Sequence, residues 1–328
     1  MLLDIKNLNT YFFTNNGIVH AVDGIDIQVE EGQTVGVVGE SGCGKSVTAL
    51  SIMGLLPKPF GNIVEGSITF RGRDLIQLTE GEMQNIRGGE ISMIFQDPMT
   101  SLNPVLTIGQ QIGESLQKHL KYNKQKALRR AVELLVEVGM PRAEQMIHEY
   151  PHQLSGGMRQ RVMIAIAMAC RPHLLIADEP TTALDVTIQA QFLDLLTRLK
   201  KKTNMAILFI THDMGVVAET CDRVIVMYCG QIVEEGDVET IFYNPQHPYT
   251  KGLLQSIPSI DTEVEWLESI NGNLPLPTDV MNGCKFASRC QYAMEPCHHE
   301  RPKLLEVSDR HKVRCFLMEG GSDNAALT

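Results

Sequence analysis

Residues 39–46 read GESGCGKS, and the fold follows from this stretch. The apolar run TVGVV (34–38) precedes it and VTALSIMGLL (47–56) follows it, which predicts a buried strand, a glycine-rich loop and a helix. Glycines at 39, 42 and 44 let backbone N–H groups turn toward phosphate oxygens, and a helix N-terminus adds partial positive charge. The stretch therefore predicts a phosphate-binding P-loop.

Two side chains of the P-loop have predicted chemical roles. Lys45 can reach the β- and γ-phosphates of a nucleotide, and the Ser46 hydroxyl can ligate Mg²⁺. Cys43 is interpreted as a small side chain at a variable position of the loop, rather than as a redox thiol. The residues expected to contact the nucleotide here are Gly39, Ser41, Gly42, Gly44, Lys45, Ser46 and Val47.

Polar residues follow two further predicted strands. In HLLIADEP (173–180), Asp178 is expected to hold Mg²⁺, and Glu179 to orient and polarise the attacking water. An Asp-Glu pair at a strand end is common, and the upstream P-loop is what makes this pair specific. MAILFITHD (205–213) ends in His212, which suits a sensor of the terminal phosphate, although a lone histidine is more often structural.

A second helix start suited to an anion lies in PHQLSGGMRQRVMIAIAMA, which begins at Pro151. Ser155, Gly156 and Gly157 come directly before a long helical stretch. A simple N-cap would explain Ser155 but not the whole set of motifs. Two phosphate-receiving helix starts in one chain favour a head-to-tail pair of chains, with each nucleotide held between one P-loop and the partner's SGG loop.

LSGGM, together with GESGCGKS, LLIADEP and ITHD, resembles the ATP-binding subunits of ABC transporters over about residues 1–240. Met158 is a small departure, because many relatives have Gln there. The resemblance implies an α/β P-loop NTPase core with an antiparallel β part and an inserted helical subdomain at about 97–158. TIGQQIGESLQKHL and KQKALRRAVELLVEVG read as helices within that insertion.

The resemblance also implies roles for individual residues. Gln96 would contact Mg²⁺ and the attacking water, Glu179 would be the catalytic base, and His212 would be the switch histidine. Phe12 would stack on adenine, and its neighbour Tyr11 is the alternative. The D-loop would be Ala183-Leu184-Asp185, and the contacts made in trans would come from Ser155, Gly156, Gly157 and Asp185.

Composition limits the classes of function. The chain has 328 residues and a net charge of −10, which disfavours a general nucleic-acid-binding surface. Its longest apolar run, VMIAIAMAC (162–170), is too short to span a bilayer, and the N-terminus lacks the apolar core of a signal peptide. We therefore expect a protein that is neither exported nor embedded in the membrane.

Two segments narrow the family branch. FQDPMTSLNPVLTIGQQI (95–112) and NPQHPYTKGLLQSIP (244–258) resemble subunits of dipeptide, oligopeptide or nickel importers. This implies a peripheral protein at the cytoplasmic face of the membrane. Its partners would be a second ATPase subunit, identical or different, two permease subunits and an extracytoplasmic substrate-binding protein, with no nucleic acid.

Two other classes of P-loop protein agree less well with the sequence than an importer subunit does. A non-transport ABC ATPase acting on nucleic acid or the ribosome usually carries long coiled-coil insertions or two cassettes, and the sequence has one cassette without sustained heptads. A P-loop kinase would leave the SGG loop unexplained.

The C-terminal region, 241–328, contains GCKFASRCQYAMEPCHHE (283–300) and a further cysteine at 315. Cys284, Cys290, Cys297 and Cys315 lack the CxxC spacing of a zinc ribbon, but His298 and His299 keep zinc open. Without a signal peptide, disulfides are disfavoured. The resemblance implies a [4Fe–4S] cluster in a small irregular domain, with zinc or unliganded thiols as alternatives. Cys43, Cys170, Cys221 and Cys229 are expected to be loop or buried residues of the ATPase core.

Overall fold

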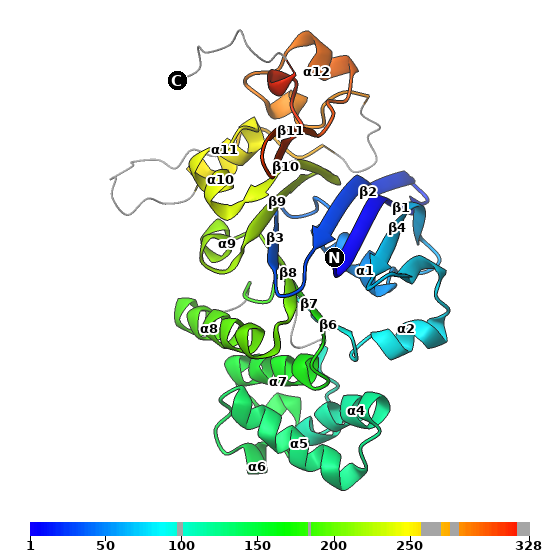
Figure 1. Ribbon diagram of the computed structural model, residues 1–328, viewed down its shortest axis with the longest axis vertical. Coiled ribbons are helices and arrows are strands. Elements are labelled where there is room, and N and C mark those ends of the chain that lie inside the picture. The colour runs from blue at the N-terminus through cyan, green and yellow to red at the C-terminus, as the bar shows by residue number, and fades with distance from the viewer. Residues whose placement is uncertain (97–100, 183–184, 257–269, 276–281, 320–328) are drawn as a thin grey trace. The chain divides into compact units, whose positions relative to one another are not determined.

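The structure is a computed structural model, and it describes residues 1–96, 101–182, 185–256, 270–275 and 282–319. The chain forms two compact units (Figure 1). The first unit contains Met1–Leu2, Val29–Thr34 and Asp74–Ile210, and the second contains Leu3–Gln28, Val35–Arg73 and Thr211–Thr328.

The first unit is built on parallel strands: β6 (Ile91–Ile94), β7 (Leu174–Asp178) and β8 (Ala206–Thr211). Leu174 is paired with Ile91 on one side and with Ala206 on the other. Every residue of β7 and β8 is buried, which explains why both read as continuous apolar runs instead of alternating patterns. The strands predicted at 173–177 and 205–211 are therefore confirmed, with a shift of one residue at the start of each.

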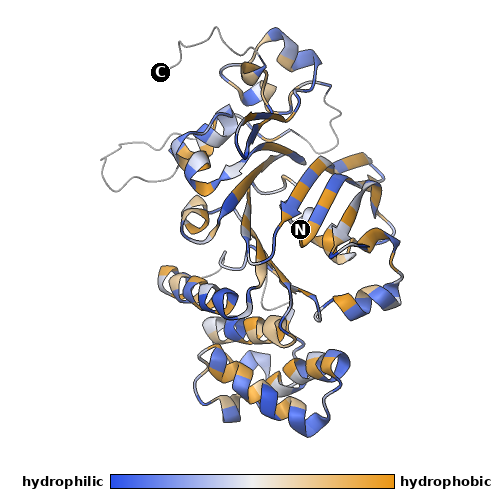
Figure 2. Ribbon diagram, viewed as in Figure 1, coloured by the Kyte–Doolittle hydropathy of each residue, from blue (hydrophilic) through white to orange (hydrophobic). Residues whose placement is uncertain are grey.

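Helices supply the rest of the first unit: α2 (Glu80–Ile86), α4 (Ile108–Leu120), α5 (Lys124–Glu137), α6 (Ala143–Met146), α7 (Gly156–Met168) and α8 (Val186–Thr203), with 3₁₀ turns at Leu75–Gln77 and Pro151–Gln153. Thr107 and Asn123 cap the starts of α4 and α5 with side-chain oxygens. Apolar residues recur at helical spacing on both helices, as the mixed colours of Figure 2 show. The predicted helices of the insertion are thus present at the predicted positions.

The second unit contains an antiparallel sheet in the order β2-β1-β4-β5: β1 (Leu3–Thr14), β2 (Gly17–Val29), β4 (Gly61–Phe70) and β5 (Arg73–Asp74). Leu3 and Ile5 are buried and pair with Phe70 and Ile68, so alternate residues of β1 and β4 face the core. Helix α1 (Lys45–Met53) follows the P-loop.

The remaining strands of the second unit run in the order β11-β12-β10-β9-β3: β3 (Thr34–Val38), β9 (Arg223–Tyr228), β10 (Gln231–Asp237), β11 (Leu305–Ser308) and β12 (His311–Val313). β3 and β9 are parallel, whereas β9, β10, β12 and β11 pair antiparallel. The helices are α9 (Met214–Thr220), α10 (Val238–Tyr243), α11 (Pro248–Gln255) and α12 (Glu295–His299), with 3₁₀ turns at Ala287–Arg289 and Phe316–Met318.

One feature of this sheet differs from the sequence-based prediction. The C-terminal region was expected to be irregular, but β12 pairs with β10 through Glu234–Val313 and Glu235–Lys312. β12 and β11 have only three and four residues, which is too short for an alternating apolar pattern to be recognised in the sequence. Hydrogen bonding of β12 to β10 is what defines these strands in the fold.

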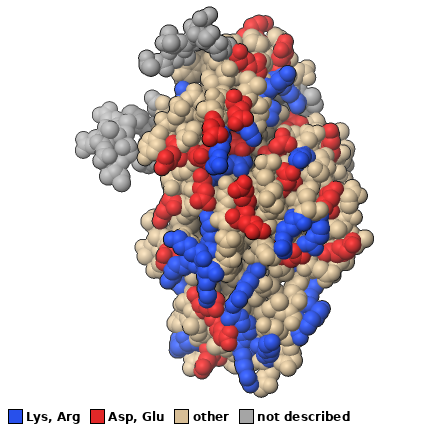
Figure 3. Space-filling model, viewed as in Figure 1, with Lys and Arg blue, Asp and Glu red and all other residues tan. Residues whose placement is uncertain are grey.

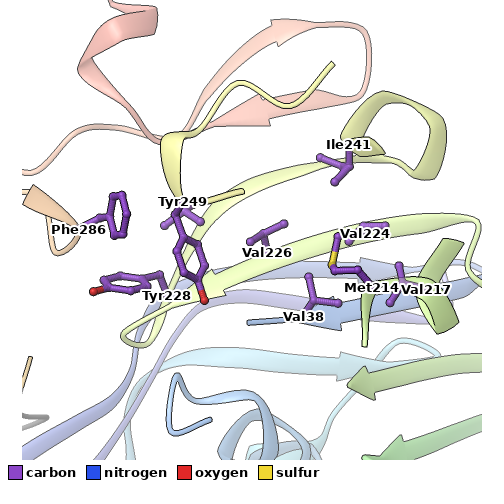
Figure 4. Close-up of a cluster of buried hydrophobic side chains, with 10 residues drawn as sticks. Val38, Met214, Val217, Val224, Val226, Tyr228, Ile241, Tyr249 and Phe286 are labelled. Carbon is purple, nitrogen blue, oxygen red and sulfur yellow. The ribbon is translucent and has the colours of Figure 1, made fainter. Parts of the chain in front are cut away.

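A buried apolar cluster joins elements of the second unit (Figure 4). Tyr228 of β9 contacts the rings of Tyr249 in α11 and Phe286 in the C-terminal region, with centroids 4.7 and 5.2 Å apart. Both pairs have edge-to-face geometry, the favourable arrangement for aromatic rings. The C-terminal region is therefore packed into the core of this unit.

Basic and acidic side chains are interspersed on the face shown in Figure 3. Within the described residues, no helix has the length and apolar character needed to cross a bilayer.

Candidate nucleotide-binding site

The P-loop has the backbone that its glycines predict. Gly39 and Gly44 have φ values of +151° and +105°. A Cβ on Gly39 would collide with the carbonyl oxygen of Met227, and one on Gly44 with that of Ala21. Because both the dihedral angle and the space exclude a side chain, glycine is required at these two positions.

Lys45 is the first residue of α1, and its side chain is held inside the loop. Its Nζ donates to the carbonyl oxygens of Gly39 (2.8 Å) and Glu40 (3.1 Å), and the residue is only 4% exposed. Ser41 and Gly42 are exposed, whereas Ser46 and Val47 are half-buried in the first turn of the helix. A buried ammonium group beside a helix N-terminus suits a phosphate.

Cys43 of the P-loop is buried, and burial raises the pKa of its thiol. The raised pKa keeps the sulfur protonated and unreactive at neutral pH. This agrees with the interpretation of Cys43 as a small loop residue. Of the other core cysteines, Cys170, Cys221 and Cys229 are half-buried, and burial raises the pKa of Cys170 and Cys229 to about 11.

The acidic pair lies at the end of β7 in the first unit. Asp178 is buried, and Glu179 has a left-handed backbone with φ +44°, an unfavourable conformation for a residue with a side chain. Glu179 Oε2 accepts hydrogen bonds from Gln96 Nε2 and Thr182 Oγ1, both at 3.1 Å. The fold therefore brings together Gln96 and Glu179, which are 83 residues apart. Sequence reasoning gave no role to Thr182.

The SGG loop forms the N-terminus of α7. Ser155 is the N-cap, and its Oγ accepts a hydrogen bond from Met158 N at 3.4 Å. Ser155 and Gly156 are exposed, and a Cβ on Gly156 would meet nothing within 4 Å. An exposed N-terminus of a 13-residue helix with open space beside it can receive an anion.

The other predicted residues are placed as follows. Asp185 caps α8 through a 2.9 Å hydrogen bond from Ile188 N, while Ala183 and Leu184 lie outside the described residues. His212 is exposed directly after β8, in the second unit.

The two candidate adenine-stacking residues lie next to each other in β1. Tyr11 stacks on His20 with ring centroids 4.0 Å apart. Phe12 pairs with Gly61 of β4, and its ring lies so close that a Cβ on Gly61 would contact it. Successive residues of a strand face opposite sides, so these two rings serve different faces of the sheet.

The four C-terminal cysteines are free thiols in one part of the second unit. Cys284 N donates to Cys297 O at 2.8 Å, and Cys297 Sγ accepts from Met294 N at 3.4 Å. Burial raises the pKa of Cys284, Cys290 and Cys315, the last to about 12, and the neighbouring cysteines raise it further. Among the described residues, no group of three or more His, Cys, Asp or Glu is arranged to hold a metal ion.

Two family models match the chain. The ABC transporter model matches residues 22–182, and the model of the oligopeptide/dipeptide transporter C-terminal region matches residues 233–297. The first range contains the P-loop, Gln96, the SGG loop and the acidic pair. The second contains α11 and three of the four C-terminal cysteines.

Curated relatives match almost the whole length of the chain. The oligopeptide transport ATP-binding protein AppD of Bacillus subtilis is 58% identical, over 97% of both chains. The oligopeptide transport ATP-binding protein OppD of the same organism is 54% identical over 97% of this chain and 89% of its own. The dipeptide transport protein DppD is 49% identical over 100% and 98%.

Solved structures share the fold. The dimeric ATP-binding cassette MJ0796 in a post-hydrolysis state with ADP and Pi is 30% identical, with a TM-score of 0.63 over 72% of this chain and 98% of that one. CbiO1 of Clostridium perfringens, part of the transporter complex cbiONQ, is 27% identical, with the same TM-score over 74% and 91%.

Proposed function

Because the chain belongs to the ABC transporter family, in the branch of oligopeptide and dipeptide ATP-binding subunits, we propose that it binds and hydrolyses ATP to drive peptide import through partner permease subunits. The observation that carries this proposal is the 58% identity to an oligopeptide transport subunit over 97% of both chains. The similarity includes the C-terminal region, which is matched by a model specific to peptide transporters.

Residues of the P-loop and the acidic pair are proposed to bind MgATP. Lys45 would neutralise the β- and γ-phosphates, and its buried position between two carbonyl oxygens supports this role. Ser46, Gln96 and Asp178 would hold Mg²⁺, since hydroxyl, amide and carboxylate oxygens are its usual protein ligands. The ion would supply charge neutralisation for the phosphates.

Glu179 is proposed to be the catalytic base. Gln96 would contact the attacking water, and His212 would sense the terminal phosphate. Hydrogen bonds from Gln96 and Thr182 orient the carboxylate of Glu179, and its unusual backbone points to a functional constraint. His212 is exposed after β8 and could hydrogen-bond a terminal phosphate oxygen.

The SGG loop is proposed to act in trans. Ser155, Gly156, Gly157 and Asp185 would contact the nucleotide of a partner ATPase subunit, in a head-to-tail pair. The exposed N-terminus of α7 supports this arrangement, and the related cassette MJ0796 is described as dimeric. Phe12 is proposed as the adenine-stacking residue, because the ring of Tyr11 already stacks on His20.

The complex is proposed to comprise a second ATPase subunit, two permease subunits and an extracytoplasmic binding protein, with this chain held peripherally at the cytoplasmic face. The helical insertion (about 97–158) within a nucleotide-binding domain of residues 1–240 would contact the permeases. A groove of about 680 Å³ between α4 and α5, lined in part by Gly109, Leu128 and Ile147, offers an apolar surface for this contact.

Residues 241–328 are proposed to form a C-terminal extension whose four cysteines bind a [4Fe–4S] cluster. Four cysteines from one part of the second unit would supply the four thiolates that such a cluster requires. Binding would require these side chains to rearrange, because among the described residues no three of them are arranged to hold a metal ion. Anaerobic purification should give a coloured protein with iron and acid-labile sulfide. Zinc, or metal-free thiols, in that preparation would overturn this assignment.

The transport function is tested on the reconstituted complex. ATP hydrolysis by the complete complex should require the permeases and rise when peptide-loaded binding protein is added. Lys45→Ala should abolish MgATP binding, since no other side chain of the loop replaces its charge. Hydrolysis stimulated by nucleic acid without any permease would contradict the proposal.

A further inference from the structure

Glu40, the second residue of the P-loop, has each of its polar groups engaged. Its carbonyl oxygen accepts from Lys45 Nζ at 3.1 Å, and its backbone N–H donates to the hydroxyl of Tyr249 at 2.8 Å. Its carboxylate binds both terminal nitrogens of Arg289, at 2.7 and 3.0 Å. Tyr249 and Arg289 are 209 and 249 residues away in the sequence, so the C-terminal region holds the P-loop at Glu40.

The side chain of Arg289 is fixed in this position. Its Nε donates to Asn271 O at 3.0 Å, one terminal nitrogen donates to Ile270 O at 3.2 Å, and the other donates to the Tyr228 hydroxyl at 3.4 Å. The side chain is only 4% exposed. A planar guanidinium held on several sides is a rigid, two-point clamp for a carboxylate.

The aromatic cluster of Figure 4 fixes the elements that carry this clamp. The ring of Phe286, three residues before Arg289, lies 5.2 Å from Tyr228 and 5.4 Å from Tyr249, centroid to centroid. Both tyrosines also belong to the polar network around Glu40. The same packed aromatic side chains therefore support both Arg289 and the P-loop residue that it binds.

We propose that Arg289 is a positioning residue for ATP binding, acting through Glu40, whose carbonyl oxygen is one of the two that accept hydrogen bonds from Lys45 Nζ. This inference rests on the proposed function, since it assumes that the P-loop receives ATP. Three of the eight loop residues are glycines, whose freedom makes ordering of the loop costly. A clamp that orders the loop in advance leaves more of the contact energy for ATP binding.

If Arg289 only stabilised the fold, the outcome would be different. Its removal would lower the thermal midpoint of unfolding, but ATP would bind the folded molecules with unchanged affinity. A positioning residue changes the dissociation constant itself. The MgATP affinity of folded protein therefore separates the two roles.

The experiment measures MgATP binding to the full-length chain by titration calorimetry, beside thermal unfolding without nucleotide. Arg289→Met and Glu40→Gln should each raise the dissociation constant about tenfold, because either change opens the clamp. Arg289→Lys, which keeps the charge but loses the two-point geometry, should fall between Arg289→Met and the unchanged chain. The double variant should bind no more weakly than Arg289→Met alone, since both changes remove one interaction.

Two further variants make the result decisive. Arg301→Met removes another arginine of the C-terminal region, whose guanidinium pairs with Asp23 of β2 at 3.1 Å, so the MgATP affinity should stay within about twofold. Tyr249→Phe removes only the hydroxyl that receives the Glu40 N–H, and it serves if Arg289→Met fails to fold.

Each outcome bears on a different claim. Unchanged MgATP affinity in folded Arg289→Met and Tyr249→Phe, or strictly additive effects in the double variant, would overturn the inference. Retained binding in Lys45→Ala would instead overturn the proposed function. Loss of binding in Lys45→Ala with normal binding in Arg289→Met would leave the function standing and remove only the role of Arg289.

Discussion

Replacing Phe286 with alanine should weaken the packing of the C-terminal region against the core of the second unit. Phe286 is 4% exposed, and its ring contacts Tyr228 and Tyr249 at centroid distances of 5.2 and 5.4 Å. Removing a buried phenylalanine side chain costs about 3–5 kcal/mol, a range that already includes the loss of its ring contacts. We therefore expect a loss of about 3 kcal/mol or more.

Native-state hydrogen exchange measures this loss where it occurs. The opening free energy of amides in residues 282–319 should fall by about 3 kcal/mol, while amides of β7 keep theirs, since local units open independently. Tyr292→Ala is the matched control: Tyr292 lies in the same region but is 37% exposed, and its loss should stay within about 0.5 kcal/mol. A loss below about 1 kcal/mol for Phe286→Ala, or an equal loss in both variants, would refute the packing role.

Three further predictions concern the catalytic acid, the P-loop and acid stability. Glu179→Gln should keep MgATP binding but lower phosphate release by about 10²–10⁴-fold, because the general base is lost while the shape is kept; undiminished turnover would exclude Glu179 as base. Gly44→Ala should abolish MgATP binding, since its φ of +105° and the facing Ala21 carbonyl reject a Cβ, whereas Gly81→Ala, with open space at α2, should bind normally. Burial lowers the pKa of His247 from 6.5 to about 3, so the folded state binds its proton less readily than the unfolded state. The stability linked to this neutral histidine is present above about pH 6.5 and is lost as the pH falls toward 3, costing about 2 kcal/mol at pH 5. Denaturant unfolding at pH 7 and pH 5 measures this loss, and a His247→Gln variant with the same pH dependence would show that other groups cause it.

The nucleotide motifs were predictable because their signals are local. A P-loop needs a strand, glycines at fixed spacing and a helix, and these lie within residues 34–56. Gly39 and Gly44 have the positive φ values that such a loop requires. The buried strands β7 and β8 were found for a similar reason, since apolar runs of this length next to turn residues have few other interpretations.

Contacts between distant residues were only partly predictable. The resemblance placed Gln96 and Glu179 in one catalytic group, and the structure joins them by a 3.1 Å hydrogen bond. Nothing in the sequence pointed to Arg289 and Glu40, although Arg289 stands directly before Cys290. The closely spaced cysteines give that segment its recognisable pattern, whereas a single arginine beside them carries no local signal of its partner.

Residues close together in the chain specify the local chemistry of this protein: a phosphate loop, an acidic strand end and a capped helix start. The pairing of the C-terminal region with β10, and its contact with Glu40 through Arg289, arise only when the chain has folded. The physical reason is that 29 basic and 39 acidic residues allow very many ion pairs, and sequence spacing does not rank pairs separated by long stretches of chain. Packing around Tyr228, Tyr249 and Phe286 selects one of them.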